Sequence, residues 1–320
     1  MNLRSLIVLA GVVLMVSNIA VGAEKYPTEP IRLIMPYTPG GGADTLGRLV
    51  ASKVAGTLPQ PIVVENKPGA NTMIATDYVA GQKADGYTLL YSSSALTINP
   101  FLYKPRYDAE KSFKPVALLA EIPLIMVTSA DSPIKSINDV LETARKNPGR
   151  LSFGSYGLGS AAHLGGALFE SLAHVKLLHV PFKGSAPALS AVMGKHIDIA
   201  IVSLESALAM VKGGNLRALG IFSPERLSSL PDTPAINEVV PGCVAVGWNG
   251  ILAPAGTPDA IVSVLNKAIN ETFTTPELKH YFANQGVPPA SHTPEEFAQA
   301  IHAETQKWGR LVKEANIKIN

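Results

Sequence analysis

A buried strand that runs through three glycines directly into a helix constrains this chain more than any other feature. The strand candidate spans 31–35, the glycines occupy 40–42, and a helical pattern starts at Thr45. Glycine lets the backbone approach a ligand closely, and the first turn of a helix offers unpaired N–H groups at its positive dipole end. The segment therefore predicts a site for an anionic group. Gly40, Gly41 and Gly42 form its centre, and Asp44 lies at the start of the helix that follows.

A second junction of this kind lies in mid-chain. A short strand over 151–153 leads into the loop 154–160, and a helix over 161–174 follows. Two such loops, with no catalytic motif between them, predict a cleft that holds a small carboxylate from two sides. Serines at two further strand or helix ends are expected at the same cleft. The candidate positions outside the two loops are His163, in the first turn of the second helix, and the strand-end or helix-start serines Ser93, Ser94 and Ser185.

Two of these residues have two interpretations each. Asp44 is either a helix-start residue favoured by the dipole, or a group that holds a ligand amino group or a bridging water. His163 either caps the cleft and orients a ligand, or packs against Gly165 and Gly166. The sequence leaves both pairs of interpretations open.

The N-terminal segment has the pattern of a secretory signal. Arg4 is followed by an apolar run over 6–16, which is too short to span a bilayer, and by small residues that end at Ala23. We expect residues 1–23 to be cleaved, with an uncleaved membrane anchor as the alternative. Cys243 is the only cysteine, so the chain has neither an internal disulfide nor a cysteine for lipid attachment at the cleavage point. A periplasmic protein is therefore expected.

Composition sets the class of molecule. The 320 residues are 47% hydrophobic and 16% charged, which is enough for a large core and two domains. Without residues 1–23, 26 Lys and Arg face 25 Asp and Glu, so no charge pattern for nucleic acid is present.

Strand and helix patterns alternate as in a parallel-sheet α/β protein. The last third instead contains two long helices without an intervening strand, and we expect them to pack back on the first domain. Strands are predicted at 31–35, 62–65, 88–92, 124–128, 151–153, 177–180, 197–202, 218–221 and 246–252. Helices are predicted at 45–56, 73–81, 137–147, 162–174, 187–193, 204–212, 257–274 and 293–313.

Motifs for catalysis and cofactors are not met. Neither Ser155 nor Ser160 has the preceding glycine of a hydrolase elbow. The glycines at 157 and 159 lack the acidic residue that a dinucleotide site needs about twenty residues later. The seven histidines show no metal-ligand spacing. We expect no catalytic residue, no metal and no cofactor.

Ordered motifs along the whole mature chain identify a family resemblance. They include the glycine loop, the run Val63–Ala70 and the run Ala84–Leu90, and they continue through His179–Gly184 and Ala253–Pro258. The chain resembles the Bug-type periplasmic solute-binding proteins of tripartite tricarboxylate transporters. This resemblance implies an α/β, two-domain periplasmic-binding-protein (Venus flytrap) fold with the ligand cleft between the domains. Backbone groups and hydroxyls of the loops would bind the carboxylate, partly through ordered water. Carried over to this sequence, the resemblance implies contacts at Thr38, Gly40, Gly41, Gly42, Ala43 and Asp44 in the first loop and at Ser155, Gly159 and Ser160 in the second.

The expected organisation follows from that fold. Domain 1 comprises 24–123 plus 247–320 and domain 2 comprises 124–246, with crossings near 121–124 and 247–251. The expected partners are a small organic acid (a di- or tricarboxylate, an amino acid or an aromatic acid) and membrane permease subunits, and the chain is expected to be a monomer. A sensor that presents its ligand to a signalling receptor is the alternative. An exported enzyme is a third hypothesis, for which Asp44 with His163 is the only titratable pair.

Two features distinguish this sequence within the family pattern. Asn71–Ala75 stands where further glycines are usual, and Ala43 stands where threonine is common, so the ligand need not be a familiar di- or tricarboxylate. Large side chains flank the predicted cleft and raise the hypothesis of an aromatic or extended acid. These side chains are Tyr37, Met73, Tyr156 and Phe182.

Overall fold

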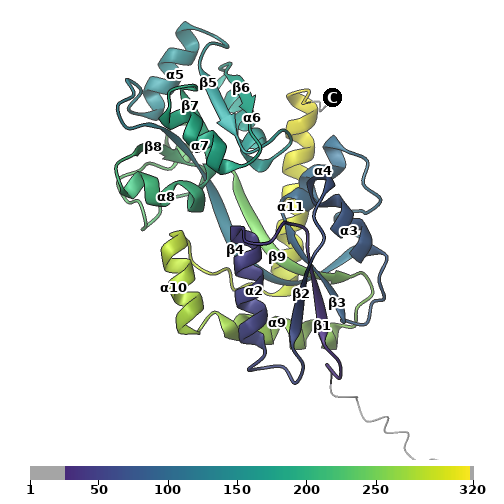
Figure 1. Cartoon of the computed structure of the whole chain (residues 1–320). Coiled ribbons are helices and arrows are strands. Elements are labelled where there is room, and N and C mark those ends of the chain that lie inside the picture. Colours follow the sequence, from purple (N-terminus) through teal and green to yellow (C-terminus); the bar gives the residue numbers. More distant parts are fainter. Residues whose placement is uncertain (1–25, 318–320) are drawn as a thin grey trace, which may run out of the picture.

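The molecule consists of two lobes joined by strands that run through both (Figure 1). The computed structural model describes residues 26–317, so the predicted signal segment 1–23 lies outside the described residues. Nine strands form one continuous sheet, in which the strands of the first lobe, the two connecting strands and the strands of the second lobe follow one another. None of the described helices is long and apolar enough to cross a membrane.

The first lobe is built on a parallel core of three strands. β1 pairs with β2 on one side and with β3 on the other, both in parallel. The strands are β1 (Ile31–Met35), β2 (Ile62–Asn66) and β3 (Thr88–Ser93). Around them lie α2 (Gly42–Val54), the 3-10 turn η1 (Ala70–Thr72), α3 (Met73–Ala80), α4 (Ala95–Leu102), α9 (Asp259–Thr272) and α10 (Pro276–Gln285).

The second lobe repeats this plan with β5 at its centre. β5 pairs in parallel with β6 and with β7. Its strands are β5 (Ser152–Ser155), β6 (Leu178–Pro181), β7 (Ile199–Ser203) and β8 (Leu216–Ile221). Its helices are α5 (Ile137–Lys146), α6 (Ala161–Ala173), α7 (Ser185–Met193), α8 (Leu204–Lys212) and the 3-10 turn η2 (Ile236–Glu238).

Two long strands connect the lobes. β4 (Phe113–Ser129) pairs with β9 (Val246–Pro254) as far as Pro123, and from Leu124 onward it pairs with β7 and β8 instead. The chain crosses back from the second lobe to the first just before β9, where the N–H of Leu124 donates to the carbonyl oxygen of Ala245. Because both changes of partner fall at this level, we propose that the domains divide there, as 24–123 plus 247–320 and 124–246.

The alternation of strands and helices predicts a parallel sheet, and this prediction is wrong for the connecting strands. β4 is antiparallel to β7, β8 and β9, and β9 is antiparallel to β3. A strand that crosses between lobes and a strand that crosses back must run in opposite directions. The sequence patterns also did not predict the helices α4 and α10 or the first half of the strand β4.

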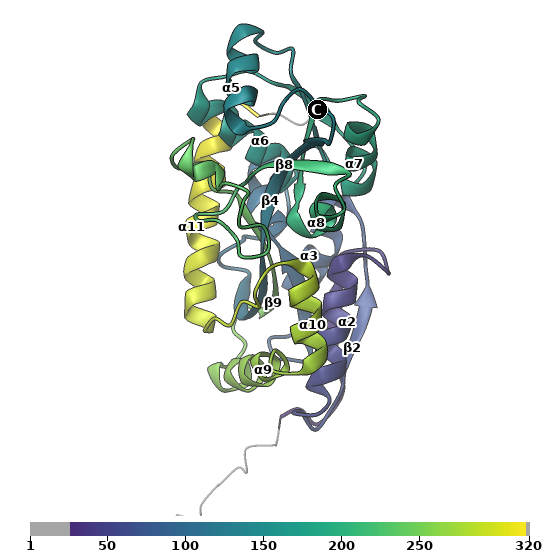
Figure 2. The same ribbon diagram turned by 90° about the vertical axis from the view of Figure 1, so that its left-hand side faces the viewer.

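The last helix, α11 (Pro294–Glu314), contacts both lobes. It begins with a capping box, in which Thr293 and Glu296 satisfy each other's backbone N–H groups. Its early residue Phe297 packs in a cluster with Trp248 of the first lobe. Its late residue Trp308 belongs to a cluster that contains Phe169 of the second lobe. The expectation that this helix packs on the first domain is therefore incomplete, because its C-terminal half contacts α6 of the second lobe as well as α4 of the first, and Figure 2 shows it running up beside the second lobe.

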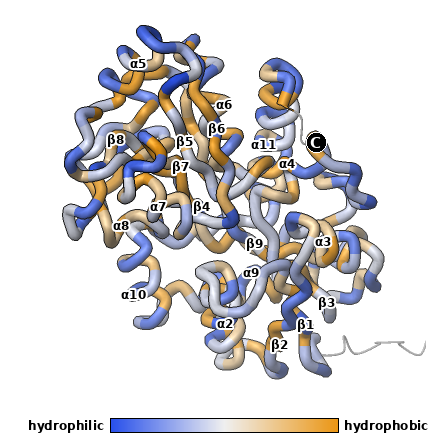
Figure 3. The backbone as a smooth tube through the Cα atoms, turned by 45° about the horizontal axis from the view of Figure 1, so that its top comes forward, coloured by the Kyte–Doolittle hydropathy of each residue, from blue (hydrophilic) through white to orange (hydrophobic). Residues whose placement is uncertain are grey.

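Hydrophobic burial holds both lobes together along the sheet. β1, β3 and the central part of β4 are almost entirely buried, and a single core cluster includes residues of both lobes. The hydropathy colouring places hydrophobic residues along the strands and hydrophilic residues on the outer turns (Figure 3). The loops at the strand ends are therefore displayed by a rigid frame.

Candidate functional site

A cavity of about 680 Å³ lies between the lobes. β4 and β9 contribute its floor, with Ile122 and Leu124 from the first and Trp248 and Asn249 from the second. The loops at the ends of β1, β3, β5 and β7 form its walls. Nine of the predicted site residues line it, namely Thr38, Gly41, Gly42, Ala43, Ser93, Ser94, Gly159, Ser160 and Ser185.

Six of the described helices begin at this cavity. The first N–H groups of a helix have no partner within it, and the helix dipole makes that end positive. Several such ends around one cavity favour an anion without any basic side chain. The lining residues at these starts are Gly41, Gly42 and Ala43 of α2, Thr72 of α3, Ser94 and Ala95 of α4, Ser160 and Ala161 of α6, Gly184 and Ser185 of α7, and Ser203, Glu205 and Ser206 of α8.

The first loop is held in place by Asp44, which does not line the cavity. Its carboxylate accepts hydrogen bonds from the N–H of Gly40 (2.9 Å), from Arg48 Nε (2.9 Å) and from Asn66 Nδ2 (2.7 Å). The bond from Arg48, together with those from Asn66 and Gly40, lowers the pKa of the buried Asp44 to about 2. The carboxylate of Asp44 therefore binds groups of the protein itself and holds the first loop. Gly40 also lies outside the cavity lining, whereas Gly41, the N-cap of α2, has no side-chain cap and faces it.

The second loop is closed by its own serines. Ser160 Oγ donates to the carbonyl oxygen of Gly157 (2.6 Å) and accepts from the N–H of His163 (3.2 Å), as an N-cap of α6. The fully buried Ser155 hydroxyl lies 2.7 Å from Nε2 of His179 and does not line the cavity. Both hydroxyls are thus engaged in hydrogen bonds inside the second lobe.

His163 lies behind the second loop and does not line the cavity. Its Nδ1 accepts from the N–H of Gly159 (3.1 Å), and its ring stacks on that of His179 with centroids 4.1 Å apart. Burial lowers the pKa of each histidine to about 4, so both are neutral near pH 7. The pair Asp44 and His163, which the enzyme hypothesis needs, contributes no side chain to the cavity lining.

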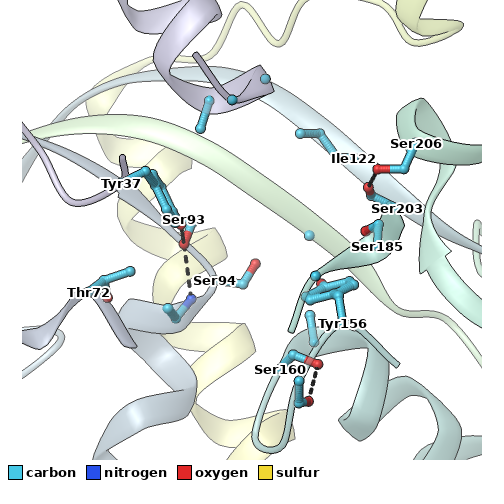
Figure 4. Close-up of a pocket in the computed structure, with 18 of the residues that line it drawn as sticks. Tyr37, Thr72, Ser93, Ser94, Ile122, Tyr156, Ser160, Ser185, Ser203 and Ser206 are labelled. Atoms are coloured by element: carbon cyan, nitrogen blue, oxygen red, sulfur yellow. Dashed lines mark hydrogen bonds between the residues drawn. The ribbon is translucent and has the colours of Figure 1, made fainter. Parts of the chain in front are cut away.

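Hydroxyl groups from the two lobes face each other across the cavity (Figure 4). Tyr37 and Ser93 share a hydrogen bond of 2.7 Å on the first lobe, and Ser203 and Ser206 share one of 2.8 Å on the second. Two of the four side chains behind the aromatic-acid hypothesis, Tyr37 and Tyr156, line the cavity, and Met73 and Phe182 do not.

The sequence analysis missed one wall and most of the floor. The missed wall comes from the start of α8 with Glu205, whereas Asn71 and Thr72 of the segment 71–75, which the sequence analysis singles out, line the cavity on the first lobe. A buried strand that ends directly at a helix start was the available signal for α8, since the same pattern marked the two glycine loops. The floor residues of β4 and β9 carry no local signal, because their position depends on how the strands pair.

In the part of the chain that the structure describes, no group of three or more His, Cys, Asp or Glu side chains could hold a metal ion. Cys243 is buried, and burial raises the pKa of its thiol to about 12, so it is unreactive as a nucleophile.

This geometry defines the chain as a periplasmic binding protein in fold. MatC from Rhodopseudomonas palustris with bound malate is 30% identical, over 90% of this chain and 100% of that one, with a TM-score of 0.76. An R. palustris protein with adipate is 30% identical, over 92% of this chain and 100% of that one, with a TM-score of 0.81.

The sequence comparisons give the family. Residues 46–317 match the tripartite tricarboxylate transporter family receptor. Protein BugT of Bordetella pertussis is 34% identical over 100% of both chains. The chain therefore belongs to the tripartite tricarboxylate transporter receptor family, a family of solute-binding receptors, as its motifs predict.

Proposed function

We propose that this protein captures a small organic carboxylate in the periplasm and delivers it to the membrane subunits of a tripartite tricarboxylate-type transporter. The observation that carries the proposal is the convergence of six helix starts on one cavity between the lobes. Lys183 is the one basic side chain among the described residues that line it, and it is exposed. Backbone N–H groups and hydroxyls are therefore the groups that meet an anion here.

The strength of such a site is sufficient for a transport receptor. A hydrogen bond to a charged group contributes about 1.5–3 kcal/mol, so about four to six of them exceed the roughly 8 kcal/mol of a micromolar Kd. The surplus covers the ordering of the ligand and of the side chains around it. No cluster of basic side chains is required.

The relatives support the ligand class and the location. The structures with adipate and with malate hold dicarboxylates in proteins of the same fold at 30% identity. Export follows from the family and from the signal pattern at 1–23, which we propose is cleaved after Ala23. The transporter partnership rests on the family alone.

A ligand screen tests the proposal. The chain is expressed at full length, recovered from the periplasm, unfolded and refolded to remove carried ligand, and melted with mono-, di-, tri- and aromatic carboxylates. A ligand at about one hundred times its Kd stabilises the protein by about 2.7 kcal/mol, which is a readily measured shift in Tm. A concentration-dependent shift with a carboxylate is expected. A folded protein that responds to none of them would refute the carboxylate assignment, and mass spectrometry of the recovered chain checks the cleavage point.

A further inference from the structure

The acidic side chain of Glu205 lies in the cavity and reaches across it. Glu205 is the second residue of α8 in the second lobe, and it lines the cavity. A Cβ built on Gly42, at the start of α2 in the first lobe, would lie 3.5 Å from Glu205 Oε1. The carboxylate therefore extends over the cleft to the opposite lobe. It is the one acidic side chain among the described residues of the lining.

The charge of Glu205 has no partner within the described residues 26–317. None of the hydrogen bonds or ion pairs formed there involves this carboxylate, and the exposed Lys183 does not pair with it. The titratable groups that surround it are phenols, namely Tyr37 and Tyr91 of the first lobe, Tyr156, and Tyr281 of α10. Burial raises the pKa of Glu205, so the ionised form is disfavoured in the empty cleft.

Position at a helix start does not account for this arrangement. An acidic residue in a first turn gains from the helix dipole, but it gains this equally when it points into solvent. Glu205 is instead half-buried and directed into the space where the other lining groups favour an anion. A dicarboxylate bound there would bring like charges together in a site of reduced solvation, which is unfavourable.

We propose that the natural ligand carries one carboxylate and one cationic nitrogen, and that Glu205 binds the nitrogen. The inference rests on the proposed function and narrows its substrate class to amino carboxylates. The ligand carboxylate meets the N–H groups and hydroxyls of the helix starts, and the ammonium group donates to Glu205. The ammonium group is the cationic partner that the Glu205 carboxylate does not have in the empty cleft. The same carboxylate repels a second negative charge, so the site selects against dianions.

Matched ligand pairs test the assignment by isothermal titration. The pairs are succinate with 4-aminobutanoate, glutarate with 5-aminopentanoate and adipate with 6-aminohexanoate, in each of which one carboxylate is replaced by an aminomethyl group. The wild-type protein is expected to bind the better amino compound at least tenfold more tightly than its dicarboxylate partner. Glu205→Gln should reduce that ratio at least tenfold. Glu29→Gln, which removes an exposed carboxylate outside the cavity lining, should leave it unchanged.

The outcomes separate this inference from the proposed function. Equal or tighter binding of the dicarboxylates, or a ratio that Glu205→Gln does not alter, would overturn the role of Glu205 and leave a carboxylate receptor in place. Binding of other carboxylates with silence from every amino compound would do the same. Silence from all carboxylates, with folding verified by circular dichroism, would overturn both. An unchanged far-ultraviolet spectrum of Glu205→Gln confirms that the variant is folded.

Discussion

Replacement of Ser160 by Ala should separate a helix cap from a ligand site. The Ser160 hydroxyl makes two internal hydrogen bonds, as acceptor from the N–H of His163 and as donor to the carbonyl oxygen of Gly157. Loss of an N-cap costs about 1 kcal/mol, and loss of the second bond costs about another 1 kcal/mol. We expect Ser160→Ala to lower the free energy of unfolding by about 2 kcal/mol and Tm by about 4 °C.

The same change should weaken ligand binding, because the hydroxyl closes the loop whose backbone lines the cavity. With the carboxylate that most stabilises the wild type, at about one hundred times its Kd, the wild-type gain is about 2.7 kcal/mol. A tenfold weaker Kd in the variant leaves about 1.4 kcal/mol at the same concentration. Thermal unfolding followed by circular dichroism, with and without ligand, measures both quantities.

Ser136→Ala is the matched control. Ser136 caps α5 by accepting from the N–H of Asp139 at 3.2 Å, and it does not line the cavity. It should lose about 1 kcal/mol of stability and keep the full ligand gain. If Ser160→Ala also keeps the full gain, the second loop has no part in binding and the argument for two opposed loops is refuted.

Three further predictions concern buried titratable groups. Asp44→Ala should lower the free energy of unfolding, measured in urea, by about 2–4 kcal/mol, because the N–H of Gly40 loses its acceptor. As a control, replacement of the exposed Asp259 by Ala should lower it by less than about 1 kcal/mol. Stability should fall as pH drops from about 6.5 toward 4, since the unfolded chain takes up protons before His163 and His179 do, and His163→Gln should reduce that loss in unfolding experiments across this range. For Glu205 the dependence of stability on pH has the opposite direction, because its raised pKa means that stability is lost as pH rises above 4.5. In the same assay, unligated Glu205→Gln should therefore be more stable than the wild type at pH 7 and equally stable below about pH 4.

Local sequence signals predicted most of the strands and helices. β1 and α8 begin and end where their patterns predict, because each is a short apolar run with clear punctuation at its ends. α4 escaped prediction because it follows β3 without a break and contains Pro100. The first half of β4 was not predicted because Pro115 and Pro123 interrupt its strand pattern. In the structure this half is a strand because β9 pairs along it.

The site was predictable as far as its loops and no further. The glycine loop and the start of α6 line the cavity, as predicted. They were predictable because the groups that face a ligand at a strand-to-helix junction are neighbours in the sequence. The roles of Asp44, Ser155 and His163 depend on partners far along the chain, such as Asn66 and His179, so spacing alone did not show that they lie behind the loops. Glu205 was missed for the same reason, since the start of α2 that it faces is far away in the sequence.

The helix α11 limits how far the two lobes can separate. With Phe297 fixed in one cluster and Trp308 in the other, α11 is a third connection beside β4 and β9. A wide opening would pull α11 away from α6, and exposure of one large buried apolar side chain costs about 1.5–3 kcal/mol, so we expect a small rotation that keeps α11 packed. On this reasoning we expect the empty receptor to differ little in shape from the loaded one. A membrane partner that must tell them apart would have to sense the rim of the cleft, where the ligand itself is visible, rather than the angle between the lobes.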